Sequence, residues 1–198
     1  ALVMCSAALF QALIMGSLYF QMGDSSDALF SRSGVMFFAV LYNTFLAQAD
    51  IPDSYLQRPI LIRQQRFAML RPSSDAIGAS LLDIPVRAIT LTVFMIVLYF
   101  MSGLSYDAGK FFIFYFTVML CTYTMIAIFR MLTAVFRSPA AATMISGILV
   151  MDFALYTGFS IPRPSMVVWW RWLSYCNPVA FSYEILLTNE FRGRTFTC

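Results

Sequence analysis

The sequence predicts an all-α integral membrane protein: a bundle of about five transmembrane helices, a helix in a cytoplasmic loop and a re-entrant external segment. Of the 198 residues, 60% are hydrophobic and only 12% are charged, against about 25% charged in an average soluble domain. Apolar runs with the length of a membrane span recur between the charged residues. The loops between them are short and do not suggest a barrel, so each span is expected to be a helix that satisfies its own backbone hydrogen bonds.

Five apolar runs have about the 17–25 residues that a helix needs to cross the hydrocarbon core. They are Ala1–Phe20, Ser33–Ala49, Ala88–Tyr106, Phe111–Phe129 and Ser138–Pro162. The first run starts without a charged residue and without an initiator methionine, so we expect residues 1–198 to be a single membrane domain within a longer protein.

The last apolar stretch, Trp172–Tyr183, has only about twelve residues, too few to cross a bilayer, and it contains Asn177-Pro178. Tryptophan is enriched at the headgroup level of membranes, and three tryptophans stand at 169, 170 and 172. We therefore expect Pro162–Cys198 to form a re-entrant or interfacial element.

The distribution of basic residues predicts the orientation. Arginines concentrate in the second loop (Arg58, Arg63, Arg66, Arg71 and Arg87) and in the fourth (Arg130 and Arg137), whereas the first and third loops carry only Arg32 and Lys110. The positive-inside rule places the second and fourth loops in the cytoplasm. Four arginines after residue 162, on the opposite side, weaken this bias.

The second loop, Asp53–Asp83, is long for a connection between membrane helices. Prolines at 59 and 72 predict helix boundaries, and Ser73, Ser74 and Asp75 could cap a new helix. Between them, a short amphipathic helix is predicted from Ile62, Arg63, Arg66, Phe67 and Leu70. Such a helix could dock on a soluble motor domain, or it could lie on anionic lipid.

Asp152 is an acidic residue inside the fifth apolar run. A carboxylate inside a span is costly and by default indicates a function. It could bind a cationic substrate, relay a proton, or pair with Arg130 or a residue of another helix.

The second run carries Phe38, Tyr42 and Phe45 at helical spacing, with Asn43 beside them. Apolar side chains with a few polar groups are typical of ligand cavities, although ordinary helix packing gives the same pattern. A second stripe follows in the fifth run, made of Met151, Leu155 and Phe159, with Gly158 allowing close approach.

The sequence contains no pattern that indicates a catalytic or metal site. The chain has no histidine, which removes His-based triads and the usual zinc sites. No G-x-x-x-x-G-K-[ST] phosphate loop and no nucleophile–base pair is present. The net charge of +3 is too small and dispersed to indicate nucleic-acid binding.

Several strings resemble one family of transporters. They are Gln57-Arg58-Pro59-Ile60, Arg71-Pro72-Ser73-Ser74-Asp75-Ala76, Leu82-Asp83-Ile84-Pro85, Tyr156-Thr157-Gly158-Phe159-Ser160-Ile161-Pro162, Trp170-Arg171-Trp172, Asn177-Pro178 with Phe181 and Glu184, and Asn189-Glu190-Phe191. In this order they resemble G-type ATP-binding-cassette exporters, above all the first membrane domain of fungal pleiotropic drug resistance transporters.

This resemblance implies the membrane domain of an ATP-driven exporter in the plasma membrane, with ATP and Mg²⁺ bound by nucleotide-binding domains outside this segment. With a second membrane domain it would surround a cavity for hydrophobic drugs or lipids. The residues implied for the cavity are Phe38, Tyr42, Asn43, Phe45, Met151, Leu155 and Phe159.

The resemblance also implies a gate above the cavity at Phe159 and Ser160, where relatives commonly have leucines, and a coupling helix that contains Arg63, Arg66, Phe67 and Leu70. An alternative is a membrane scaffold or channel subunit without a motor. A lipid or polysaccharide exporter would differ only in substrate, and a membrane enzyme is the least favoured class.

Overall fold

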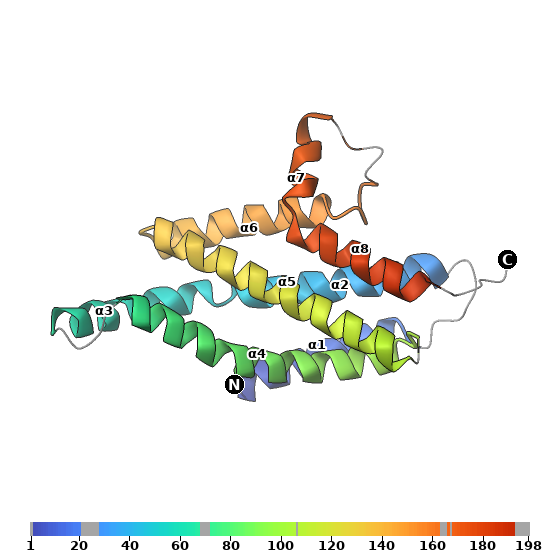
Figure 1. Ribbon diagram of the computed structural model, residues 1–198, viewed down its shortest axis with the longest axis horizontal. Coiled ribbons are helices and arrows are strands. Elements are labelled where there is room, and N and C mark those ends of the chain that lie inside the picture. Colours follow the sequence, from blue (N-terminus) through green and yellow to red (C-terminus); the bar gives the residue numbers. More distant parts are fainter. Residues whose placement is uncertain are drawn as a thin grey trace.

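The fold is a bundle of helices that run along a common axis (Figure 1). The computed structural model describes residues 2–20, 28–67, 72–105, 107–162, 166 and 168–192. All regular elements within these residues are helical: α1 (Leu2–Leu18), α2 (Ala28–Gln48), α3 (Ile51–Arg66), α4 (Pro72–Met101), α5 (Ala108–Val135), α6 (Pro139–Leu155), a 3₁₀ turn η2 (Val168–Trp170), α7 (Arg171–Tyr175) and α8 (Pro178–Phe191). The predicted all-helical fold is confirmed.

Three stretches of helix are long and apolar enough to cross a membrane: Leu29–Gln64, Leu81–Met101 and Ala108–Val135. The first covers α2 and most of α3. Helices α1 and α6 are apolar but have only 17 residues each, the lower end of the range that spans a bilayer. These five apolar helices correspond to the five predicted runs.

Two predicted spans extend further at their C-terminal ends than the helices do. The third was expected to reach Tyr106, but α4 ends at Met101 and Gly103 follows with a φ of 66°. The fifth was expected to reach Pro162, but α6 ends at Leu155 and Gly158 has a φ of 99°. A positive φ is readily adopted by glycine and interrupts a right-handed helix, which hydropathy alone does not register.

The prolines of the second loop behave differently from one another. Helix α4 begins at Pro72 as predicted, and a proline at the first helical position loses no hydrogen bond. The boundary predicted at Pro59 is wrong, because α3 continues through it from Ile51 to Arg66. An interior proline removes one hydrogen bond and often kinks a helix without ending it.

The segment after α6 completes one side of the bundle. Helix α6 covers the half next to α3, and α8 covers the other half (Figure 1); both pack against α2 and α5. The chain leaves α6, forms η2 and α7, and returns at Asn177. The Asn177 side chain accepts from the amides of Val179 and Ala180 as the N-cap of α8, and it donates to the Phe153 carbonyl of α6 at 2.7 Å.

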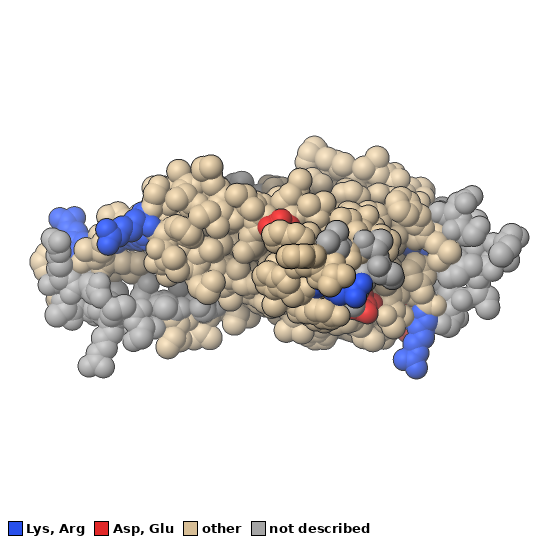
Figure 2. Space-filling model, turned by 90° about the horizontal axis from the view of Figure 1, so that it is seen from above, with Lys and Arg blue, Asp and Glu red and all other residues tan. Residues whose placement is uncertain are grey.

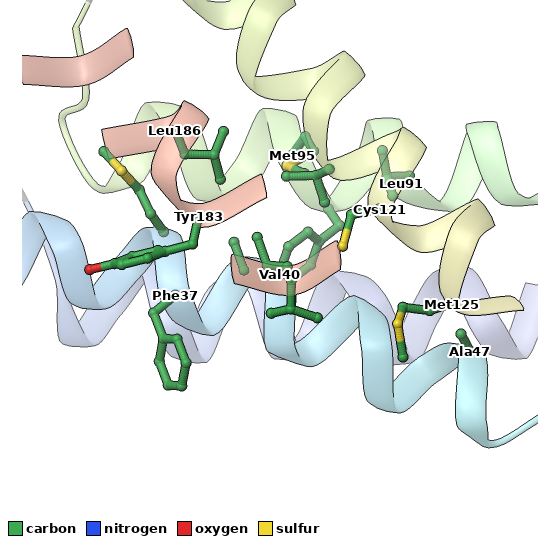
Figure 3. Packing of buried hydrophobic residues seen from close by; sticks show 14 of the residues in the cluster. Phe37, Val40, Ala47, Leu91, Met95, Cys121, Met125, Tyr183 and Leu186 are labelled. Carbon is green, nitrogen blue, oxygen red and sulfur yellow. The ribbon is translucent and has the colours of Figure 1, made fainter. Parts of the chain in front are cut away.

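The core lies where α2, α4, α5 and α8 meet. Figure 3 shows Val40 of α2, Met95 of α4, Cys121 of α5 and Leu186 of α8 gathered from these helices, and all four are at most 3% exposed. Many large apolar side chains are exposed on the surface of the bundle. On the face that Figure 2 shows, only a few charged side chains interrupt the uncharged surface between the basic groups toward the two ends. This distribution suits a lipid environment.

Candidate functional site: an apolar face on two adjoining helices

Helix α2 presents one exposed aromatic stripe. Phe30, Phe38 and Phe45 are 71%, 38% and 48% exposed, and at 100° per residue they lie within about 80° of one another on the helix circumference. The remaining sides of α2 pack against the bundle. Two of the predicted cavity residues, Phe38 and Phe45, therefore lie on a face that is partly exposed within the described part of the chain.

Helix α6 presents a second exposed stripe. Met144, Ile148, Met151 and Leu155 recur every three or four residues, and all four are at least 40% exposed. The opposite side of α6 is buried through Ser146, Val150 and Phe153. Met151 and Leu155, both predicted as cavity residues, thus belong to a continuous apolar face.

The two stripes belong to helices that touch. Near the α3 end of the bundle, Gln48 of α2 donates to the Ser146 hydroxyl of α6 at 3.0 Å. Near the other end of α2, Phe159 stacks on Phe30 with ring centroids 5.4 Å apart. We call Phe30, Phe38 and Phe45 together with the four α6 residues the α2–α6 face.

Two predicted cavity residues point elsewhere. Asn43 is 2% exposed and donates to the Ala39 carbonyl of its own helix; it lies about 140–160° around α2 from Phe38 and Phe45. Tyr42 is half-buried and stacks on Phe94 of α4, with centroids 4.9 Å apart. Asn43 is therefore on the buried side of α2, away from the exposed stripe. Its position around the helix, and not its polar side chain, decides this placement.

Phe159, predicted both for the cavity and for the gate, lies in an aromatic cluster at the end of the α2–α6 face that is farther from α3. Its ring is 4.7 Å from that of Phe37 and meets Tyr183 edge-on at 6.1 Å. Phe37 and Tyr183 lie close together in Figure 3 as well. Ser160, the other predicted gate residue, is exposed in the turn after α6. The cluster comes from α2, α8 and the connection after α6, which sequence spacing could not bring together.

Asp152 borders the α6 stripe and is half-buried. Of its predicted alternatives, the pair with Arg130 is not found, because Arg130 binds Asp83 of α4. Within the described part of the chain, the Asp152 carboxylate makes no hydrogen bond or ion pair.

The predicted coupling helix forms the end of α3. Arg63 and Phe67 are exposed there, whereas Leu70 and the side chain of Arg66 lie outside the described residues. The amphipathic stretch was expected as a separate helix, but it continues α3 because Pro59 does not end that helix.

Two ion pairs near the α3 end were not predicted as pairs. Arg87 of α4 binds Asp50, which lies between α2 and α3, and Arg130 of α5 binds Asp83 of α4. Both pairs line a cavity of about 350 Å³ between α1, α3, α4 and α5. The sequence shows these residues only as loop charges, since their partners lie 37 and 47 positions away.

A third pair closes the opposite end of the bundle. Arg32 of α2 and Glu190 of α8 are 3.0 Å apart, and their side chains are 2% and 3% exposed. Glu190 also accepts from the Ser105 amide, and Arg32 donates to the Gly103 carbonyl. The pair joins α2, the α4–α5 turn and the end of α8.

The chain matches the family described as ABC-2 type transporter over residues 2–191. It is 41% identical over 94% of its length to ABC multidrug transporter atrH of Aspergillus oryzae. It is 39% identical over 97% of its length to ABC multidrug transporter G of Aspergillus fumigatus, and 39% identical over 98% of its length to protein SNQ2 of Saccharomyces cerevisiae. The chain spans only 13%, 14% and 13% of these three proteins.

Proposed function

Because the chain belongs to the ABC-2 type transporter family, as a membrane domain of that family, we propose that it forms half of the export pathway for hydrophobic drugs or lipids in the plasma membrane. Two of the relatives described above carry the name ABC multidrug transporter. The observation that carries the proposal is the α2–α6 face, an apolar aromatic surface on two adjoining helices that is exposed among the residues the structure describes.

A second membrane domain of the same transporter would face this surface and enclose the pathway. Phe38, Phe45, Met151 and Leu155 would contact substrate through apolar area and aromatic stacking. The aromatic cluster around Phe159 would close the outer end, with Ser160 beside it. Asp152, at the edge of the stripe, would favour substrates that carry a positive charge.

Energy would come from ATP and Mg²⁺ bound by nucleotide-binding domains elsewhere in the protein, since this sequence has no phosphate-loop string. Their movement would reach the membrane domain through the end of α3 at Arg63 and Phe67. Substrate must bind the inward-open state more tightly than the outward-open state, because only differential affinity lets ATP-driven switching release it outside.

The test uses the intact protein in inside-out vesicles, with ATP-driven uptake of rhodamine 6G and a smaller cationic dye as the readout. Phe45→Ala should change the ratio of the two uptake rates by about tenfold, since one apolar contact contributes about 1–3 kcal/mol to discrimination. Phe116→Ala, at an equally exposed phenylalanine of α5, should leave the ratio unchanged.

Equal uptake ratios in Phe45→Ala and the unmodified protein would overturn the assignment of the α2–α6 face. If the unmodified protein shows no uptake that depends on ATP, a scaffold or channel without a motor becomes the better description.

A further inference from the structure

Helix α3 touches both helices of the α2–α6 face. It continues α2 after a break of only two residues, Ala49 and Asp50, and it also packs against α5 and α6. A displacement of α3 would therefore act on α2 through the chain, and on α6 both through their packing and through any contact that holds the α5–α6 connection.

Two side chains of α3 make that contact. The Tyr55 hydroxyl lies 2.7 Å from the Phe136 carbonyl and 3.3 Å from that of Thr133. Arg58 donates to the same two carbonyls, one nitrogen to Phe136 at 3.3 Å and the other to Thr133. The guanidinium also lies 4.0 Å from the centre of the Tyr55 ring, which aligns the two side chains.

These carbonyls belong to the C-terminal end of α5, which ends at Val135 with Phe136 as its cap. The last carbonyls of a helix have no partner within it, and a cation there also complements the helix dipole. The connection to α6 contains only Phe136, Arg137 and Ser138. Holding Phe136 therefore holds the start of α6, whose exposed stripe begins at Met144.

We infer that Tyr55 and Arg58 form a clamp that transmits movement of α3 to α6, so that both helices of the α2–α6 face move together during the transport cycle. The inference rests on the proposed export function and makes both side chains positioning residues, which act on the pathway through the α5–α6 connection. The two donor residues lie three positions apart on α3, and the two acceptors lie three positions apart at the end of α5, so a rotation or shift of α3 changes both sets of bonds at once.

The experiment compares variants of the intact protein reconstituted in liposomes, measuring rhodamine 6G transport and ATP hydrolysis in the same preparation. Arg58→Met keeps the length of the side chain but removes every donor, and Tyr55→Phe removes only the hydroxyl. Combined, they should lower the dye transported per ATP hydrolysed by about fivefold or more. The dye concentration that gives half-maximal stimulation of ATP hydrolysis should stay the same, because neither side chain belongs to the α2–α6 face.

Arg58→Lys should recover most of the lost ratio, since an ammonium group still donates to terminal helix carbonyls. Gln57→Ala, exposed on the same helix, should match the unmodified protein. A general loss of folding would lower transport and ATP hydrolysis by the same factor. That result, like any unchanged amount of dye transported per ATP hydrolysed in the double variant, would overturn the inference. An unmodified protein without ATP-dependent transport would instead refute the proposed function, so the two failures are distinguishable.

Discussion

At the scale of single residues, partners distant in the sequence decide the role of several charged groups. From the sequence alone, Arg32 is an isolated charge in the first loop. In the structure it is 1% exposed and bound to Glu190, which lies 158 residues further along the chain. Glu190 accepts from the Ser105 amide as well. Three separate segments therefore depend on one buried carboxylate.

We expect Glu190→Gln to destabilise the protein by about 3–5 kcal/mol, because it leaves the buried guanidinium of Arg32 without its counter-charge. The double variant Arg32→Met/Glu190→Met removes both charges and should lose less than the single variant. Thermal unfolding of purified protein in one detergent measures both, with Arg171→Gln at an exposed position of α7 as the control. A double variant less stable than Glu190→Gln would contradict this account.

At the scale of elements, two short helices, α6 and α8, together cover one side of α2 and α5, although one longer span was expected after α5. Helix α6 is about 25 Å long, and α8 supplies the cover beyond it over α2 and α5. The join depends on Asn177, which is fully buried and makes three hydrogen bonds to α6 and to its own helix. A Pro at the first position of α8 follows it, as is common at helix starts.

Asn177→Ala should destabilise α8 by about 1–3 kcal/mol, the sum of a lost helix cap and one lost hydrogen bond to the Phe153 carbonyl, which still accepts from the Thr157 hydroxyl. Asn177→Ser should lose less, because a serine hydroxyl can still cap the helix although it is too short to reach α6. Hydrogen–deuterium exchange should show faster exchange in residues 179–191 of the alanine variant and little change in α5. Unaltered exchange in α8 would show that packing alone holds the helix in place.

At the scale of the whole molecule, alternate connections gather at opposite ends of the bundle (Figure 1). The α5–α6 connection lies at the end where α3 lies, and the α4–α5 turn lies at the other. This arrangement agrees with the predicted cytoplasmic position of the second and fourth loops, because antiparallel helices place alternate loops on the same side of the membrane.

Single-cysteine labelling tests that orientation. In a background without the native cysteines, Ala108→Cys at the start of α5 should react with an impermeant maleimide on intact cells. Ala140→Cys, at the start of α6, should react only after the membrane is permeabilised. Both alanines are exposed, so a difference in labelling would report the side of the membrane and not burial within the chain. The reverse labelling pattern would invert the orientation predicted by the positive-inside rule.

Much of the architecture follows from composition alone. The five apolar runs, the start of α4 at Pro72 and the helical state of every span could be predicted, because hydrocarbon permits few backbone structures and proline and charge mark their ends. Of the residues predicted for the cavity, Phe38, Phe45, Met151 and Leu155 lie on the exposed α2–α6 face. Helical spacing could predict that they share a face with their neighbours, since residues three, four or seven apart do so.

The sequence by itself determined the membrane environment, the helices and two candidate apolar stripes, since these depend on local hydropathy and on the period of the helix. Only the tertiary structure decided that Asn43 turns into the bundle, that Phe159 stacks on Phe37, that Arg32 pairs with Glu190, and that Tyr55 and Arg58 cap the end of α5. Each of these depends on contacts between segments far apart in the chain, and such contacts are set by the packing of whole helices, which no single stretch of sequence encodes.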